Sequence, residues 1–296
     1  MKVTYPFVAS WILEDSINSA DDRLTTFVLE YPRFIHAELL THRALSKNAS
    51  SSRAVPGARM LEHATRDVVL PLRWGMNQPG MQAAPGNLTA EDAARAEAIW
   101  RRMAEACAEG VRELHELKLH KQWANRPLEW FSTIKVLVTA TDWDNFFTLR
   151  DHPNAQPELE YLAHMMREKM KANEPRRVKG CDRTDALDWH LPFVTLEERF
   201  HHRDAPVFLA RLSAARCCRI SYLNHEGKAS TLEEDLDRFE RLVKEQPIHA
   251  SPLEHQAYPA VTGQGGSWRK RNFQGWCQFR CVVEEDWPHG LWGSEK

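Results

Sequence analysis

Hydrophobic and polar positions alternate along residues 23–31, a stretch rich in Thr, Phe, Val and Leu. A period of two is typical of a β-strand with one buried face. Residues 273–283 alternate in the same way and predict a second strand. Apolar residues elsewhere recur at helical spacing, and the helices that they predict are at residues 34–45, 58–67, 89–117, 122–137, 142–149, 156–171, 205–213 and 231–244.

The longest predicted helix has a clear start. Thr89 is a good N-cap and Asp92 follows it by three residues, an arrangement that satisfies free N–H groups of the first turn. Serine-rich residues 48–57 and Pro/Gly-rich residues 71–86 predict loops. Residues 87–171 are therefore expected to form a helical middle.

Composition is that of a soluble globular protein, with 296 residues of which 43% are hydrophobic and 27% charged. A net charge of −2 gives no general attraction to nucleic acid or to an anionic membrane. The first residues carry no long apolar segment and no window is long enough to span a membrane. We therefore expect a cytoplasmic protein that binds neither nucleic acid nor membrane, and whose phosphate affinity is local.

The six cysteines do not resemble the framework of a secreted disulfide-rich protein, and we expect them to be reduced. Neither a Cys-x-x-Cys pair nor a His-x-x-x-His spacing supports a zinc site. No metal is therefore expected.

Residues 42–53 contain two arginines, a histidine, an asparagine and four serines, with almost no bulky apolar side chain. Guanidinium groups bind phosphate through paired, charge-assisted hydrogen bonds. Serine hydroxyls and the backbone amides of a tight turn can complete such a site. The segment therefore predicts a phosphorylated ligand.

The same segment resembles the signature of flavin-dependent thymidylate synthases, in which Arg-His-Arg is followed by seven residues, a serine and, two further on, an arginine. His42, Arg43, Ser51 and Arg53 fall in register with it. The residues that match the family's lead-in to this motif are Phe27, Pro32, Phe34 and Ile35.

Three further blocks resemble the same family. Residues 145–158 match its Asn-Phe-x-x-Leu-Arg and Ala-Gln-x-Glu-Ile elements through Asn145, Arg150, Gln156 and Glu158. Residues 215–222 and 249–255 resemble its Ala-Arg-Val-Ser-Tyr and His-x-Ser-Pro-Phe-Glu-His blocks. In ordinary members these last two come first, so the order here looks like a circular permutation, which folds tolerate when their chain ends are close.

The resemblance implies a mixed α/β (α+β) fold, with helices packed on a mixed sheet in a single domain of residues 1–296. It also implies an enzyme that methylates C5 of a uracil nucleotide. Reduced FAD would accept the one-carbon unit from methylenetetrahydrofolate, and NADPH would recharge the flavin. The family assembles as homotetramers with flavin sites shared between subunits, so we expect the same here.

Site residues follow from the same resemblance. Those implied to hold the flavin are His42, Arg43, Asn48, Asn145, His249 and Ser251. Those implied to hold the nucleotide are Glu38, Ser51, Ser52, Arg53, Arg126 and Arg150. Ser51 and Arg150 are the catalytic candidates. For Arg150 the reason is that a guanidinium beside a uracil carbonyl stabilises negative charge that develops on the ring.

Several positions depart from the family. Thr41 replaces the first arginine of the triplet, Glu38 replaces a glutamine, and Ala49 replaces a glutamate. Thr139 and Thr141 stand where an asparagine and an arginine contact flavin. A ribonucleotide acceptor, UMP beside dUMP, is therefore open, and so is a nucleotide-binding protein of this fold that has lost methylase activity.

Simpler interpretations exist for single motifs. His42 and Arg43 could be cations at the C-terminus of a helix, interacting with its dipole. In residues 249–255, Ser251 could be an N-cap with Glu254 as its capping-box partner.

Asn145 and Arg150 could lie on a solvated helix face. A methyltransferase that adds a cysteine thiolate to the ring is the chemical alternative to a flavin enzyme.

Overall fold

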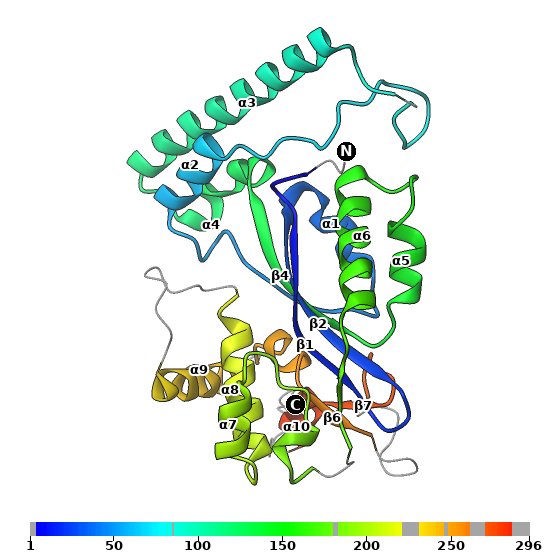
Figure 1. Cartoon of the computed structure of the whole chain (residues 1–296). Coiled ribbons are helices and arrows are strands. Elements are labelled where there is room, and N and C mark those ends of the chain that lie inside the picture. The colour runs from blue at the N-terminus through cyan, green and yellow to red at the C-terminus, as the bar shows by residue number, and fades with distance from the viewer. Residues whose placement is uncertain are drawn as a thin grey trace, which may run out of the picture.

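The computed structural model describes residues 4–84, 86–179, 183–220, 231–245, 248–260 and 270–285. Its centre is a five-stranded sheet of strand order β3-β4-β2-β1-β5 (Figure 1). The strands are β1 (Ala9–Ile17), β2 (Arg23–Pro32), β3 (Ser46–Ala49), β4 (Thr133–Ala140) and β5 (Arg176–Arg177). Neighbours are antiparallel except β1 and β5, which are parallel. The sheet is therefore mixed.

Alternation along β2 and β4 gives the sheet two buried faces. Phe27 and Leu29 of β2 join Val136 and Val138 of β4 in the main core. The helices on that face are α1 (His36–Leu40), α5 (Asp144–Arg150) and α6 (Pro157–Ala172), and a 3₁₀ turn, η1 (Arg33–Ile35), precedes α1. The expected mixed α/β (α+β) fold, with helices packed on a sheet, is confirmed.

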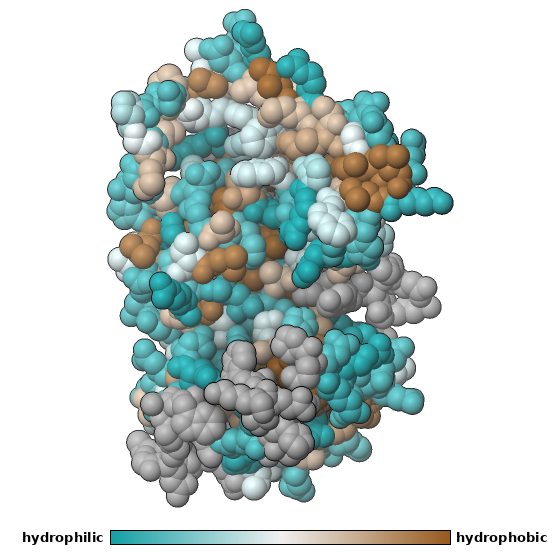
Figure 2. All heavy atoms as spheres, turned by 180° about the vertical axis from the view of Figure 1, so that it is seen from behind, coloured by the Kyte–Doolittle hydropathy of each residue, from teal (hydrophilic) through white to brown (hydrophobic). Residues whose placement is uncertain are grey.

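A second core lies at one end of the sheet. It joins α2 (Gly57–Arg66), α3 (Ala90–Glu116), α4 (Lys121–Ala124) and the 3₁₀ helix η2 (Arg126–Phe131). The Thr89 hydroxyl accepts the N–H of Asp92, which confirms the predicted start of α3. Exposed apolar side chains follow α3 at Leu117, Trp123 and Trp130. Figure 2 shows hydrophobic surface gathered at this end of the molecule.

A third core belongs to the C-terminal part of the chain, below the sheet in Figure 1. Its helices are η3 (Ala186–Asp188), α7 (Leu196–His201), α8 (Pro206–Cys218), α9 (Leu232–Lys244), η4 (Ser251–Glu254) and α10 (Phe279–Glu285). Two short antiparallel strands, β6 (Ala257–Pro259) and β7 (Trp276–Gln278), form a separate sheet. That all three cores form one domain stays a prediction.

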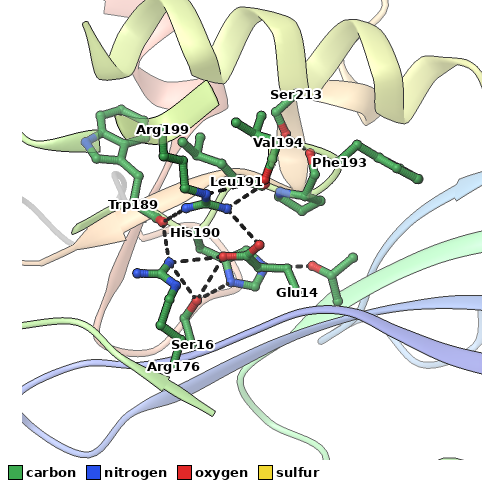
Figure 3. Close-up of polar contacts among 12 residues, drawn as sticks. Glu14, Ser16, Arg176, Trp189, His190, Leu191, Phe193, Val194, Arg199 and Ser213 are labelled. Carbon is green, nitrogen blue, oxygen red and sulfur yellow. Dashed lines mark hydrogen bonds and ion pairs between the residues drawn. The ribbon is translucent and has the colours of Figure 1, made fainter. Parts of the chain in front are cut away.

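A cluster of ion pairs connects the C-terminal part of the chain to β1 (Figure 3). A bulge in β1 between Ile12 and Glu14 accompanies it. Glu14 binds Arg176 at 3.0 Å and Arg199 at 2.7 Å. Arg199 also donates to the carbonyls of Trp189 and Leu191, so the guanidinium is held by the backbone as well as by one carboxylate.

A chain of buried hydrogen bonds continues from this cluster through the sheet. Ser16 Oγ contacts His190 Nδ1 at 2.9 Å, and His190 Nε2 contacts Thr26 Oγ1 at 2.7 Å. Thr26 contacts Thr139, and Thr139 contacts His255 Nδ1 at 2.8 Å. The polar face of β2 and β4 is therefore tied to the C-terminal part.

Several predicted elements are wrong. Residues 122–137 form α4, η2 and the start of β4 instead of one helix, because Pro127 lies in the first turn of η2 and Ile134 and Val136 alternate with polar residues. Residues 273–283 contain only the three residues of β7 before α10 begins.

Smaller differences concern element ends. The helix predicted at 34–45 ends at Leu40, the loop predicted at 48–57 begins inside β3, and the helix predicted at 205–213 extends to Cys218. The predicted cap at Ser251 is also wrong, because η4 is capped by Ala250 without a side-chain bond and Glu254 pairs with Arg280. Within the described residues, no helix is both long and apolar enough to cross a membrane.

Candidate functional site

Arg150, the last residue of α5, bonds to α1 and to the segment that follows it. Its Nε donates to His42 Nε2 at 2.8 Å. Its Nη1 donates to Glu38 at 3.3 Å, and its Nη2 donates to Thr41 Oγ1 at 3.3 Å. We call these four residues the Arg150 cluster. The cluster brings together two blocks that the sequence pattern identified, the arginine motif and residues 145–158.

His42 is neutral in this arrangement. Its ring is buried and packs edge-on against Phe146, with ring centroids 5.0 Å apart. Burial lowers the pKa of His42, and the nearby charges of Arg150 and Lys47 lower it further. Because Nε2 accepts a hydrogen bond, the proton lies on Nδ1. The helix-dipole interpretation needs a protonated histidine and is not supported.

A cavity of about 340 Å³ opens beside the Arg150 cluster. Arg43 and Asn145, both exposed, lie on its lining with His42, Phe146 and Arg150. Small-ligand pockets typically enclose about 300–1,000 Å³. The polar lining fits part of a flavin dinucleotide, but the volume leaves no room for all of it.

The other residues implied to hold flavin lie apart from this cavity. Asn48 is buried in β3, and its amide donates to the carbonyl of Cys217 at 2.8 Å. Ser251 Oγ donates to Asn48 Oδ1 at 3.3 Å. His249 is exposed, and its backbone N–H bonds to Leu242. The structure thus brings the two C-terminal blocks to the arginine motif, although Ser221 and Tyr222 lie outside the described residues.

Ser51 and Arg53 lie in a tight turn after β3. Ser51 Oγ accepts from the backbone N–H of Arg53 at 3.3 Å and from its Nε at 3.4 Å. Ser52 is buried, and its Oγ has no partner among the described residues. Arg53 itself is exposed and available to a ligand.

Asn125 holds this turn in place. Its Nδ2 donates to the carbonyl of Ser52 at 2.8 Å and to that of Val55 at 3.0 Å. The side chain is completely buried. Sequence reasoning missed Asn125, because its partners are backbone carbonyls about 70 residues away and no local pattern indicates them.

The residues implied to hold the nucleotide therefore form two groups. Strand β3 separates the turn with Arg53 from the Arg150 cluster, and its four residues span on the order of 13 Å. Arg126 is exposed and binds Glu129 at 3.0 Å, and within the described residues it makes no hydrogen bond or ion pair to either group. Among the described residues of one chain, no hydrogen bond joins Arg53 to Arg150 or to its three partners.

Cys217, Cys218 and Cys281 are not activated thiols. Burial raises the pKa of Cys217 well above its usual value and that of Cys218 to about 11. Burial also raises the pKa of the Cys281 thiol. Thiolate chemistry needs the opposite shift. In the part of the chain that the structure describes, no group of His, Cys, Asp and Glu could hold a metal ion.

Comparison with known proteins gives one sequence match. The model of the Thy1 family, described as thymidylate synthase complementing protein, matches residues 23–176, just over half of the chain. This range contains the arginine motif and Arg150 but ends before residues 215–222 and 249–255, so it does not test the permuted order. No curated protein matches the sequence.

Two solved structures are similar at low identity. The UMP/dUMP methylase PolB from Streptomyces cacaoi bound with 5-Br UMP has 16% identity and a TM-score of 0.44, covering 56% of this chain and 89% of that one. The same methylase bound with 5-Br dUMP has 22% identity and a TM-score of 0.40, covering 51% and 66%. The sequence match across residues 23–176 shows that the chain belongs to the thymidylate synthase complementing proteins, the family of flavin-dependent thymidylate synthases, and is a thymidylate synthase-like methyltransferase.

Proposed function

We propose that the protein transfers a one-carbon unit from methylenetetrahydrofolate to C5 of UMP or dUMP, with FAD as cofactor and NADPH as reductant. The observation that carries this proposal is the Arg150 cluster, in which α5 delivers a guanidinium to the arginine motif beside a cavity. The family match supports the reaction class.

Arg150 is equipped to polarise the uracil ring. Its bonds to Glu38, Thr41 and His42 use three of the five guanidinium N–H groups. Two N–H groups remain for a ligand carbonyl. Because the side chain is only 21% exposed and its orientation is fixed in advance, it would stabilise negative charge on the ring without reorganisation.

FAD, when bound, supplies the redox chemistry that carries the one-carbon unit. Arg43 and Asn145 would hold part of it in the 340 Å³ cavity. The remainder needs further surface, which supports a flavin site shared between subunits of a homotetramer. The exposed apolar residues Leu117, Trp123 and Trp130 offer one surface for subunit contact.

The same arrangement supports a nucleotide bound between subunits. Arg53 is exposed, and β3 keeps it away from Arg150 of its own chain. We infer that the turn with Ser51, Ser52 and Arg53 of one subunit acts together with the Arg150 cluster of another. A monomer would then be inactive.

The sugar specificity is proposed to be relaxed. Glu38 is 39% exposed although it pairs with Arg150, so its carboxylate can still accept a hydrogen bond from a sugar hydroxyl. Ala49, beside the turn, leaves space where the family has a glutamate. UMP should therefore be methylated beside dUMP.

A second candidate is nucleotide binding without catalysis. Thr139 is buried and bonded to Thr26 and His255, and Thr141 accepts the N–H of Gln274. Both positions, which contact flavin in the family, thus serve the structure here. Purified protein that binds nucleotide but neither shows nor acquires flavin absorbance would select this candidate.

The test of the first proposal is label transfer. Carbon-labelled methylenetetrahydrofolate is incubated with enzyme, FAD and NADPH, and with UMP or dUMP in parallel, and the labelled nucleotides are separated. Label in both supports the full proposal. Label in dUMP alone contradicts the ribonucleotide part, and label in neither contradicts the methylase.

A further inference from the structure

A second, smaller cavity lies behind the turn that carries Ser51 and Arg53. Its volume is about 150 Å³, and residues from β2, η1, α2 and β4 line it together with Ser50 and Val55 of the turn. Three of the lining residues are cations, Arg33, Arg59 and Lys135. None of them belongs to the arginine motif.

The cavity carries excess positive charge. Among the described residues on its lining Glu30 is the only carboxylate, and it pairs with Lys135 at 3.6 Å. The side chain of Arg59 has no ion-pair or hydrogen-bond partner within the described part of the chain. This local excess contrasts with the net charge of −2 of the whole protein.

Arg33 is only weakly compensated. Its side chain is 13% exposed and lies 3.5 Å from Glu129, a carboxylate that binds Arg126 more closely, at 3.0 Å. Its Nη2 donates to the carbonyl of Ser50 at a long 3.4 Å. The enclosed Nε has no partner among the described residues. A buried cation with an unused donor is costly unless a ligand supplies the acceptor.

The chemistry of the lining selects the ligand. Two arginines and a lysine line a volume too small for a nucleoside but sufficient for a phosphate or carboxylate group. We propose that this cavity is an oxyanion site formed by Arg33, Arg59 and Lys135. It would bind one anionic end of a substrate whose remainder lies over the turn.

The identity of the oxyanion rests on the proposed function. A uracil nucleotide offers its 5′-phosphate, and a folate offers the carboxylates of its glutamate. Asn125 fixes the turn that lies between the cavity and the exposed Arg53. The cavity and Arg53 would therefore bind opposite sides of one anionic group, or two neighbouring anionic groups. Both sources share the same oxyanion chemistry.

Binding of inorganic pyrophosphate to the full-length protein, measured by calorimetry at constant ionic strength, tests the site without any nucleotide recognition. Arg59→Met and Lys135→Met should each weaken binding by about tenfold, which is ~1.4 kcal/mol. Arg66→Met is the matched control, because Arg66 is on the same helix, is paired with Glu62 and does not line the cavity. It should bind as the wild type does.

Arg33 is tested by Arg33→Lys, which keeps the charge of this enclosed residue. It should retain binding but more weakly, since an ammonium cannot replace the guanidinium fork. Wild-type protein that does not bind pyrophosphate, or equal binding by wild type, Arg59→Met and Lys135→Met, would overturn the proposal.

Paired ligands identify the source. UMP is compared with uridine, and 4-aminobenzoylglutamate with 4-aminobenzoate, each in wild type and Arg59→Met. Phosphate as the source predicts that only UMP loses affinity in the variant, and the folate tail predicts that only the glutamate compound does. No loss for either compound would contradict the proposed role in substrate binding.

Label transfer separates this proposal from the proposed function. Pyrophosphate binding that depends on Arg59 in a protein that transfers no label would refute the methylase and support the oxyanion site. The opposite result is a protein that transfers label but in which neither Arg59→Met nor Lys135→Met weakens the binding of any tested anion. This result would refute the site and leave the methylase supported.

Discussion

The Nε of Arg150 donates to Nε2 of His42 at 2.8 Å, across 108 positions of the chain. This bond fixes both partners, because it requires the Nδ1–H tautomer of the imidazole and directs the guanidinium along the cavity. Glu38 balances the charge of the arginine at 3.3 Å. The consequence is a preorganised cation whose orientation depends on a neutral histidine.

Replacing Arg150 should therefore affect catalysis directly. Arg150→Ala is expected to lower kcat for label transfer by roughly 10²–10³-fold, the usual effect of removing a preorganised donor. Arg167→Ala, which removes an arginine paired with Asp151 on the neighbouring α6, is the matched control. An Arg150→Ala enzyme with normal kcat and normal folding would contradict the assignment.

Arg53 should behave differently. It is exposed at the turn, and within the described parts of the chain its side chain bonds only to Ser51. Arg53→Ala should weaken nucleotide binding by about tenfold, or ~1.4 kcal/mol, and change turnover at saturating nucleotide much less. Equilibrium binding of UMP and dUMP measures this, with Arg112→Ala on α3 as a surface control. Equal affinity in wild type and Arg53→Ala would argue against a phosphate contact.

The turn itself can be tested through Asn125. Asn125→Ala removes both hydrogen bonds to the carbonyls of Ser52 and Val55, and the Ser52 carbonyl then keeps only its long 3.3 Å bond from the Val55 N–H. The expected loss of folding free energy is about 1–3 kcal/mol. Nucleotide affinity measured below the unfolding temperature should also fall. Unchanged affinity would mean that the turn does not contact the nucleotide.

The sequence predicted which residues belong to the site better than it predicted how they are arranged in space. The motif register located His42, Arg43 and the turn with Arg53, and β2 and α3 were found from local periodicity and a cap. Spacing could not show that Arg150 reaches His42, since that contact depends on how α5 packs on the sheet. It also could not show that β3 separates Arg53 from Arg150.

The errors of prediction have local causes. Residues 133–137 were assigned to the helix predicted at 122–137 because apolar residues are dense there, yet β-branched Ile134, Val136 and Val138 favour a strand buried on both faces. Strand β1 went unpredicted because its bulge at Glu14 interrupts the alternation. Arg33 and Lys135 form a cavity only because β2 and β4 pair, which no local pattern reveals.

A flavin mechanism also predicts that no cysteine is essential. Each of Cys107, Cys181, Cys217, Cys218, Cys277 and Cys281, replaced singly by Ser or Ala, should leave turnover within about tenfold, or ~1.4 kcal/mol in the barrier. The raised pKa of the buried Cys217 and Cys218 thiols supports this. Loss of all activity in one well-folded variant would favour thiolate addition to the ring.

Buried histidines should make the protein labile to acid. Burial lowers the pKa of His36 to about 4 and that of His255 to about 3. The pKa values of His42 and His190 are lowered for the same reason. In the unfolded chain these groups titrate near 6.5. Below that pH the unfolded state binds more protons than the folded state.

Stability is therefore highest above pH 6.5 and falls as the pH decreases towards 4, by at most ~1.4 kcal/mol per pH unit for each such histidine. Protonation of carboxylates reduces the stability only at lower pH, since Glu198, which is bound by Arg216, has a pKa of about 2. Urea unfolding at pH 7.5, 6.5 and 5.5 measures the effect. His36→Gln, which can still bond Tyr31, should flatten the dependence, whereas equal stability at pH 5.5 and 7.5 would mean that these histidines are not held neutral.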